Sequence, residues 1–489
     1  MTDELERLAS GCIFPGFEGP TAPDWVRRRI DEGLGGVVLY AWNVESREQL
    51  RNLTSQLRAG RADLLVGIDE EGGDVTRLEA ATGSSYPGNA ALGVVDDVDL
   101  TERVASSMAT ELAEVGVDLD FAPVADVNTN PQNPVIGIRA FGDEPELVSR
   151  HVAAFVRGLQ AGGVAACAKH FPGHGDTSED SHLSLPVVAS LEEAALLPFR
   201  AAVEAGALSL MTAHIVVRSL GETPATMSRA ILHELLRDEL GFDGMVMTDA
   251  LEMKAISGNG GVEEGAVRAI VAGADALCLG HDLFDESVVR VRDALVTAVR
   301  SGRISEERLG EAVGRVQRVA SWCANTNARA SVDRSVGRTA ARRALRVEGT
   351  ARLERPALVV ELEPDAGMAA GRLAQTPADW LGSVVPDAET LRFGEGAVDS
   401  DLDFDGRQLV IVARDAHRHA WQRDAIEALT ARAPDAAVVE VGLPHWRPAN
   451  VGTYVCTYGA ARVNVEAAAE WLYSRERRGV EQSGSSPGS

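Results

Sequence analysis

The first two-thirds of the chain alternates short apolar runs with helical patterns, and this alternation constrains the fold more than any other feature. Such alternation is typical of a parallel sheet wrapped by helices. Eight of the apolar runs are candidate strands: residues 11–14, 36–40, 64–68, 117–122, 164–168, 208–212, 244–248 and 276–279. Eight parallel strands close a (β/α)8 ring, so the pattern predicts an α/β TIM barrel.

A second domain is expected because the chain has 489 residues, whereas single cores rarely exceed roughly 250–300 residues. Further apolar runs at 356–362, 408–413, 437–441 and 454–457 are separated by helical stretches near 417–431 and 465–473. We therefore predict the TIM-barrel domain over 1–337, a linker over 338–350, a smaller α/β sandwich domain over 351–478 and a flexible tail over 479–489.

Composition narrows the possible partners and the compartment. The net charge is −26 and the pI is about 4.8, which argues against nucleic acid or an anionic membrane as a partner. The five cysteines are scattered and odd in number, as expected for free thiols in a reducing compartment. The sequence has neither a secretion-signal pattern nor an apolar run of about 20 residues, so we expect a cytoplasmic protein.

The stretch KHFPGHGDTSEDSH, from Lys169 to His182, follows the apolar run at 164–168. Its proline and glycines exclude a helix and predict an irregular loop. Other polar residues also follow predicted strands: Asp69, Asp126, His214, Asp249 and His281. Since the carboxyl ends of barrel strands meet on one face, these side chains should converge there.

Three interpretations of this stretch compete. It could be a polar surface turn, but the only two lysines of the chain, Lys169 and Lys254, lie beside candidate site residues. A metal site would take its ligands from His170, His174, Asp176 and His182, yet Pro172 breaks the helix that would align such spacing. In the third interpretation Lys169 and His170 hold a sugar, and His182, oriented by Asp180, transfers a proton.

The third interpretation agrees with a family resemblance. KHFPGHGDTSEDSH resembles the signature of β-N-acetylglucosaminidases (β-N-acetylhexosaminidases) of glycoside hydrolase family 3 in their two-domain form. The resemblance extends to five further motifs in the same order: IDEEGGDVTRLE, DFAPVADVN, NPVIGIRAFG, MTAHIVV and MTDALEMKAI. It covers the first two-thirds of the chain strongly and the last third more loosely.

The resemblance implies a retaining exo-β-N-acetylglucosaminidase with Asp249 as nucleophile and His182, oriented by Asp180, as acid/base. Asp249 follows the apolar run at 244–248, where a strand would hold its carboxylate rigidly, although it could also cap a helix. The residues that bind the sugar would be Asp69, Arg77, Arg139, Lys169 and His170, with Asp126, Met211 and His214 lining the same pocket. Glu70 and Glu71 are expected only to shape their turn with Gly72 and Gly73. No metal and no organic cofactor is implied.

The expected partner is a small saccharide, either a muropeptide or a chitooligosaccharide fragment; the sequence gives neither the leaving group nor the oligomeric state. Phosphorolysis at the same site is an alternative, because a neutral histidine would not repel phosphate. A Schiff-base enzyme using Lys169 and an inactive sugar-binding protein are further alternatives. A polar cluster in the second domain is expected to serve the fold or a domain contact: Arg414, Asp415, His417, His419 and Trp421.

Overall fold

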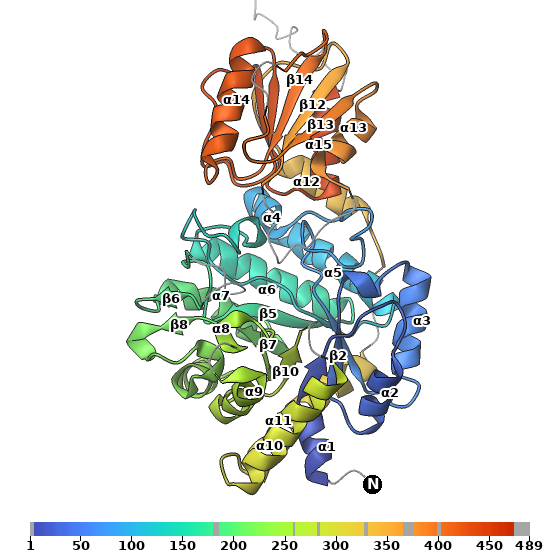
Figure 1. The fold of residues 1–489 in the computed structure, drawn as a ribbon, viewed down its shortest axis with the longest axis vertical. Coiled ribbons are helices and arrows are strands. Elements are labelled where there is room, and N and C mark those ends of the chain that lie inside the picture. Colours follow the sequence, from blue (N-terminus) through green and yellow to red (C-terminus); the bar gives the residue numbers. More distant parts are fainter. Residues whose placement is uncertain are drawn as a thin grey trace, which may run out of the picture. The chain divides into compact units, whose positions relative to one another are not determined.

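The computed structural model describes residues 4–178, 185–257, 260–280, 284–326, 331–364, 375–398 and 402–473. The chain divides into two compact units (Figure 1). The first runs to Ala344 and the second begins at Leu345, apart from the short segment Ala461–Val463, which groups with the first unit. This division falls inside the predicted linker; the predicted tail at 479–489 lies outside the described residues.

The first unit contains all eight predicted strands. They are β1 (Ile13–Pro15), β2 (Gly36–Leu39), β3 (Leu65–Ile68), β4 (Leu119–Asp120), β5 (Ala165–Phe171), β7 (Ser209–Thr212), β9 (Met245–Thr248) and β10 (Leu277–Leu279). Parallel pairing runs in the order β2-β3-β4-β5-β7-β9, and β1 pairs with β10. A parallel bridge between Met247 and Ala276 joins β9 to β10, and Gly35 N–H donates to Ser10 O (3.0 Å) beside β1 and β2. The predicted TIM barrel is confirmed.

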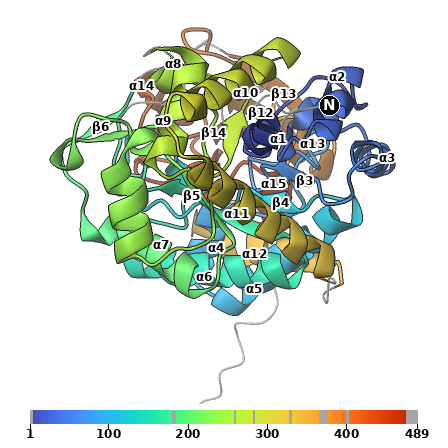
Figure 2. The ribbon, with the colours of Figure 1, turned by 90° about the horizontal axis from the view of Figure 1, so that it is seen from below.

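Helices surround this ring of strands (Figure 2). The helices of this unit are α1 (Glu4–Ser10), α2 (Asp24–Asp31), α3 (Arg47–Leu57), α4 (Asn89–Val95), α5 (Val98–Glu114), α6 (Pro145–Ala161), α7 (Glu193–Glu204), α8 (Lys254–Ser257), α9 (Gly261–Ala272), α10 (Asp285–Arg300), α11 (Glu306–Asn325) and α12 (Ser335–Ala344), with a further helix at Ala230–Glu239. A two-stranded ribbon, β6 (Val187–Val188) and β8 (Val216–Val217), also belongs to this unit. Because helices cover one face of the strands and the barrel interior covers the other, every residue of these eight strands is buried, and most are apolar, as the sequence predicted.

The amino-terminal end of the barrel is closed by α11. Val316 and Val319 of this helix pack with residues of the barrel interior, among them Phe121 and Met247. Its Arg308 contacts the fully buried Asp275, just before β10, at 3.0 Å. A helix across this end leaves the carboxyl-terminal end of the strands as the place for a site.

The second unit is a six-stranded sheet with helices, in agreement with the predicted α/β sandwich. Its strands are β11 (Arg346–Gly349), β12 (Ala357–Leu362), β13 (Glu389–Phe393), β14 (Gln408–Ala413), β15 (Ala437–Glu440) and β16 (Thr453–Cys456), in the order β11-β16-β15-β14-β12-β13. All pairs are parallel except β11 with β16. The helices are α13 (Pro377–Val384), α14 (Ala420–Arg432) and α15 (Arg462–Tyr473). Four strands were predicted, and the two edge strands β11 and β13 were not.

Candidate active site

The carboxyl ends of β3, β4, β5, β7 and β9 carry most of the predicted site residues. Asp69 follows β3 directly, Lys169 and His170 lie within the last residues of β5, and Asp249 follows β9 directly. Asp126 and His214 lie a few residues beyond β4 and β7. The barrel topology therefore gathers these groups at one end, as expected for a barrel enzyme.

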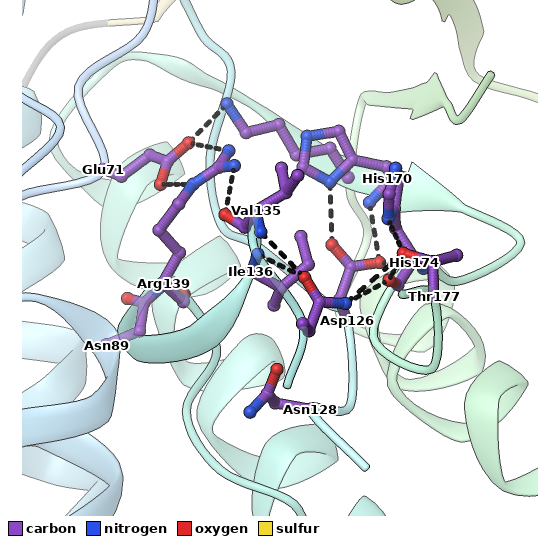
Figure 3. Close-up of polar contacts among 12 residues, drawn as sticks. Glu71, Asn89, Asp126, Asn128, Val135, Ile136, Arg139, His170, His174 and Thr177 are labelled. Atoms are coloured by element: carbon purple, nitrogen blue, oxygen red, sulfur yellow. Dashed lines mark hydrogen bonds and ion pairs between the residues drawn. The ribbon is translucent and has the colours of Figure 1, made fainter. Parts of the chain in front are cut away.

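A network of charges connects four predicted site residues (Asp69, Arg77, Arg139 and Lys169) with Glu71. Figure 3 shows Glu71 and Arg139 turned towards each other. Lys169 Nζ contacts Asp69 Oδ1 at 2.6 Å and Glu71 Oε1 at 2.7 Å. The Arg139 guanidinium donates to both oxygens of Glu71, at 2.7 and 2.9 Å. Arg77 lies 3.7 Å from the second oxygen of Asp69. The network thus joins the loop after β3, the short helix at Gly137–Arg139 and strand β5, which are separated by tens of residues in the sequence.

The electrostatics of this network keep Glu71 and Lys169 ionised. Burial alone would raise the pKa of the Glu71 carboxyl, but Arg139 and Lys169 together hold it well below its usual range. Burial alone would lower the pKa of Lys169, but Asp69 and Glu71 raise it above its usual value. A Schiff-base mechanism needs a neutral amine, so this environment opposes the role of Lys169 as a covalent nucleophile.

Glu70 and Glu71 have different roles, although the sequence analysis treated them alike. The Glu70 carboxylate accepts the backbone N–H groups of Arg77 (2.8 Å) and Leu78 (2.9 Å), so it shapes its loop as predicted. Burial raises the pKa of Glu70 to about 7. Glu71 instead turns towards Lys169 and Arg139, so the expectation that it only shapes the turn was wrong.

Asp126 organises the loop that follows β5 (Figure 3). Its Oδ2 accepts a hydrogen bond from His170 Nδ1 (2.7 Å), and its Oδ1 accepts the backbone N–H of His174 (2.7 Å). Burial would raise the pKa of Asp126, but His170 and His174 bring it below its usual value. The carboxylate therefore fixes the orientation of the His170 ring and the path of the loop.

His174, a ligand in the metal interpretation of this stretch, has contacts that hold the loop together. Its Nδ1 lies 2.7 Å from the Thr177 hydroxyl, and its carbonyl accepts from Asn133 (2.9 Å). Burial lowers the pKa of His174 to about 4, so the ring is neutral at pH 7. In the part of the chain that the structure describes, no three His, Cys, Asp or Glu side chains are placed to hold a metal ion.

Asp249 lies in a turn that is fixed from two sides. Its Oδ1 accepts the N–H of Ala250 at 2.8 Å. His214, which is fully buried, bonds through Nε2 to the Ala250 carbonyl (3.0 Å) and through Nδ1 to the Thr226 hydroxyl (2.7 Å). The next helix, α8, begins only at Lys254, so Asp249 does not cap it. His214 thus supports the turn that carries Asp249.

Three further predicted residues complete the comparison. Met211 is 4% exposed and packs in the barrel interior beneath the other groups. Asp180 and His182, the predicted proton-transfer pair, lie outside the described residues.

Glu71 is the residue that the sequence analysis missed. Alternation along an extended segment was the available signal, because it places residues 69 and 71 on one side and residue 70 on the other.

Comparison with known proteins gives a consistent family. The model of the glycosyl hydrolase family 3 N-terminal domain matches residues 23–319. A beta-hexosaminidase of Neisseria meningitidis serogroup B is 38% identical over 275 residues, covering 53% of this chain and 75% of that protein. Beta-hexosaminidase A of Pseudoalteromonas piscicida is 35% identical over 321 residues, covering 58% of this chain and 53% of the relative, so the match spans about half of that relative's length.

A solved structure resembles the chain over almost its whole length. It is a glycoside hydrolase family 3 beta-N-acetylglucosaminidase from Paenibacillus sp., with 35% identity and a TM-score of 0.86, and the match covers 96% of each chain.

Among the described residues, no helix is both long and apolar enough to cross a membrane.

Proposed function

Because the chain belongs to glycosyl hydrolase family 3 and is therefore a glycoside hydrolase, we propose that it hydrolyses terminal β-linked N-acetylglucosamine with retention of configuration. Relatives named beta-hexosaminidase and beta-N-acetylglucosaminidase support this substrate. The reaction would proceed through a covalent glycosyl-enzyme on Asp249. The natural substrates would be muropeptide or chitooligosaccharide fragments, handled in the cytoplasm without a metal or organic cofactor.

The position of Asp249 supports its role as nucleophile. Retention needs a carboxylate on one face of the sugar and a proton donor on the other. Asp249 extends from a rigid strand end, and the bonds of Ala250 to Asp249 and to His214 restrict its turn. A carboxylate held in this way loses little freedom when it attacks the anomeric carbon.

The charged network would hold the sugar. Lys169 and Arg139 present ionised donors, Asp69 is an ionisable acceptor, and Arg77 and His170 lie around them. Charge-assisted hydrogen bonds to sugar hydroxyls and to the N-acetyl group are the strong kind. Asp126 would act through His170 by orienting its ring. Glu71, which contacts both cations, would position Lys169 and Arg139 rather than bind sugar directly.

Proton transfer is assigned to His182 with Asp180 as its orienting partner. The imidazolium would protonate the leaving oxygen as the bond to Asp249 forms. The neutral imidazole would then remove a proton from the water that releases the sugar. An imidazole with an ordinary pKa of about 6.5 suits both steps near neutral pH. This assignment rests on the family resemblance of the loop 169–182.

The observation that carries the proposal is the ionised Lys169–Glu71–Arg139 network at the same barrel end as Asp249. The test uses a nitrophenyl β-N-acetylglucosaminide as substrate. Asp249→Ala should lower kcat about a thousandfold or more, because a nucleophile has no substitute. The matched control is Asp243→Ala, an exposed aspartate before the other end of β9, which should leave kcat unchanged.

The same assay separates hydrolysis from phosphorolysis. We expect free N-acetylglucosamine at a rate that does not depend on phosphate. A sugar 1-phosphate formed only in the presence of phosphate would replace hydrolysis with phosphorolysis. Unchanged turnover by Asp249→Ala would contradict the nucleophile assignment itself.

A further inference from the structure

An aromatic pair follows β2 at the carboxyl end of the barrel. The rings of Tyr40 and Trp42 are stacked, with centroids 4.8 Å apart and planes inclined by 15°. The indole Nε1–H of Trp42 donates to the Phe17 carbonyl at 3.0 Å. Trp42 is nevertheless 41% exposed. A large aromatic ring is thus fixed in orientation and still accessible.

Tyr40 connects this ring to the candidate active site. A Cβ on Gly16 would lie 2.7 Å from the Tyr40 ring and 2.9 Å from the Gly280 carbonyl, so the ring packs beside the ends of β1 and β10. Burial raises the pKa of the Tyr40 hydroxyl well above its usual value, and the Cys278 thiol and the carboxylates of Glu252, Asp69 and Asp249 raise it further. The Gly280 N–H also donates to Glu252 Oε2 at 2.9 Å, and Glu252 lies three residues after Asp249, so the Tyr40 ring lies at the same end of the barrel as Asp249.

The pair therefore lies at the carboxyl end of the barrel, with Tyr40 packed beside the ends of β1 and β10 and Trp42 exposed to solvent. A sugar whose anomeric carbon reaches Asp249 must extend its leaving group outward from the pocket. Single exposed apolar residues are common and carry no meaning by themselves. Trp42 differs because its ring is stacked and hydrogen-bonded, and a fixed aromatic face can bind the C–H face of a pyranose at little entropic cost.

We propose that Trp42 is the platform for the sugar ring on the leaving-group side of the scissile bond. This inference rests on the proposed function, because it assigns a binding role next to the same site. The ligand that Trp42 would bind is the pyranose to which the terminal N-acetylglucosamine is β-linked. Tyr40 acts as a positioning residue by supporting the inner face of the indole.

The test compares two substrates that share the terminal sugar. One is the β-linked disaccharide of N-acetylglucosamine, and the other is methyl β-N-acetylglucosaminide, which has no ring on the leaving-group side. Trp42→Ala should lower kcat/KM for the disaccharide about five- to tenfold and change it less than twofold for the methyl glycoside. Trp42→Phe should retain most of the disaccharide activity. Val271→Ala, at a residue of similar exposure (45%) on α9, is the matched control and should affect neither substrate.

The outcomes separate this inference from the proposed function. If the wild-type enzyme cleaves both substrates and Trp42→Ala affects them equally, or affects neither, the platform assignment is wrong. If the wild-type enzyme cleaves neither substrate, the proposed function is wrong. A thermal melt of each variant shows whether it is folded. If Trp42→Ala is unfolded, the platform assignment is judged by Trp42→Phe, which should retain most of the disaccharide activity.

Discussion

Replacing Glu71 with glutamine tests the charged network at a buried anion that lies between two cations. The Glu71 side chain is only 3% exposed and contacts two cations, Lys169 at 2.7 Å and Arg139 at 2.7 and 2.9 Å. When the charge of Glu71 is removed, Lys169 still forms its ion pair with Asp69, and Arg139 still donates to the Val135 carbonyl (3.1 Å). Removing one partner of a buried ion pair costs about 3–5 kcal/mol. Since glutamine keeps one acceptor oxygen, we expect about 3 kcal/mol, near the lower end of that range.

Urea denaturation of the wild type and the variant at pH 7 measures this loss. The matched control is Glu102→Gln, because Glu102 pairs with Arg157 at 2.9 Å but is 40% exposed. That substitution should cost less than about 1 kcal/mol. A loss of the same small size for Glu71→Gln would refute the reasoning.

The pH dependence gives a second measure of the same interaction. The pKa of Glu71 is lower in the folded protein than its ordinary value of 4.5. Its contribution to stability is therefore present above that value and is lost as the pH falls through the lower, folded value. The difference in unfolding free energy between wild type and Glu71→Gln should shrink as the solution is acidified below pH 4.5. A difference that stays constant with pH would contradict an ionised Glu71.

Three further predictions follow from the same part of the barrel. The pKa of Glu70 is raised from 4.5 to about 7, so the contribution of Glu70 to the free energy of unfolding falls by about 3 kcal/mol as the pH rises through this interval. In urea titrations between pH 5 and 8, Glu70→Gln should therefore lose less stability with rising pH than the wild type does. The same pH dependence in both proteins would contradict this. Asp126→Asn removes the charged acceptor of His170 Nδ1 and should lower kcat/KM on the nitrophenyl glycoside about tenfold or more, whereas an unchanged value would exclude a role for this bond. A Cβ on Gly280 would lie 1.2 Å from Glu252 Oε1, so Gly280→Ala should lower the Tm. Adding Glu252→Ala to this variant should recover part of the lost Tm. If the losses of the two single variants simply add, the clash is not the cause.

The strands were predictable because strands buried on both faces are mostly apolar. All eight barrel strands and four strands of the second unit met the condition of burial, and their polar residues lie mainly near the strand ends. The edge strands β11 and β13 did not, since Glu348 is exposed in one and Arg392 in the other, and polar residues within a short strand hide it. Edge strands are defined by their pairing with distant segments, and a local sequence pattern does not reveal this pairing.

The candidate site was only partly predictable, because its contacts join distant parts of the sequence. The motifs identified Asp69, Arg139 and Lys169, which the fold brings together around Glu71. The position of Glu71 depends on which side of the loop after β3 faces the barrel interior. Local alternation places Glu71 on the same side as Asp69, but which of the two sides faces the barrel interior follows from the packing of the whole barrel. His214 shows the same limit, because its support of the Asp249 turn depends on a loop from a neighbouring strand.

The role of Asp249 is tested most directly by trapping the covalent intermediate. The enzyme would be incubated with a fluorinated N-acetylglucosamine inactivator whose glycosyl-enzyme breaks down slowly, then digested and mapped by mass spectrometry. We predict one sugar adduct, on the peptide that contains Asp249, and no adduct in Asp249→Ala. An adduct on another carboxylate, such as Asp69 or Glu252, would contradict the mechanism.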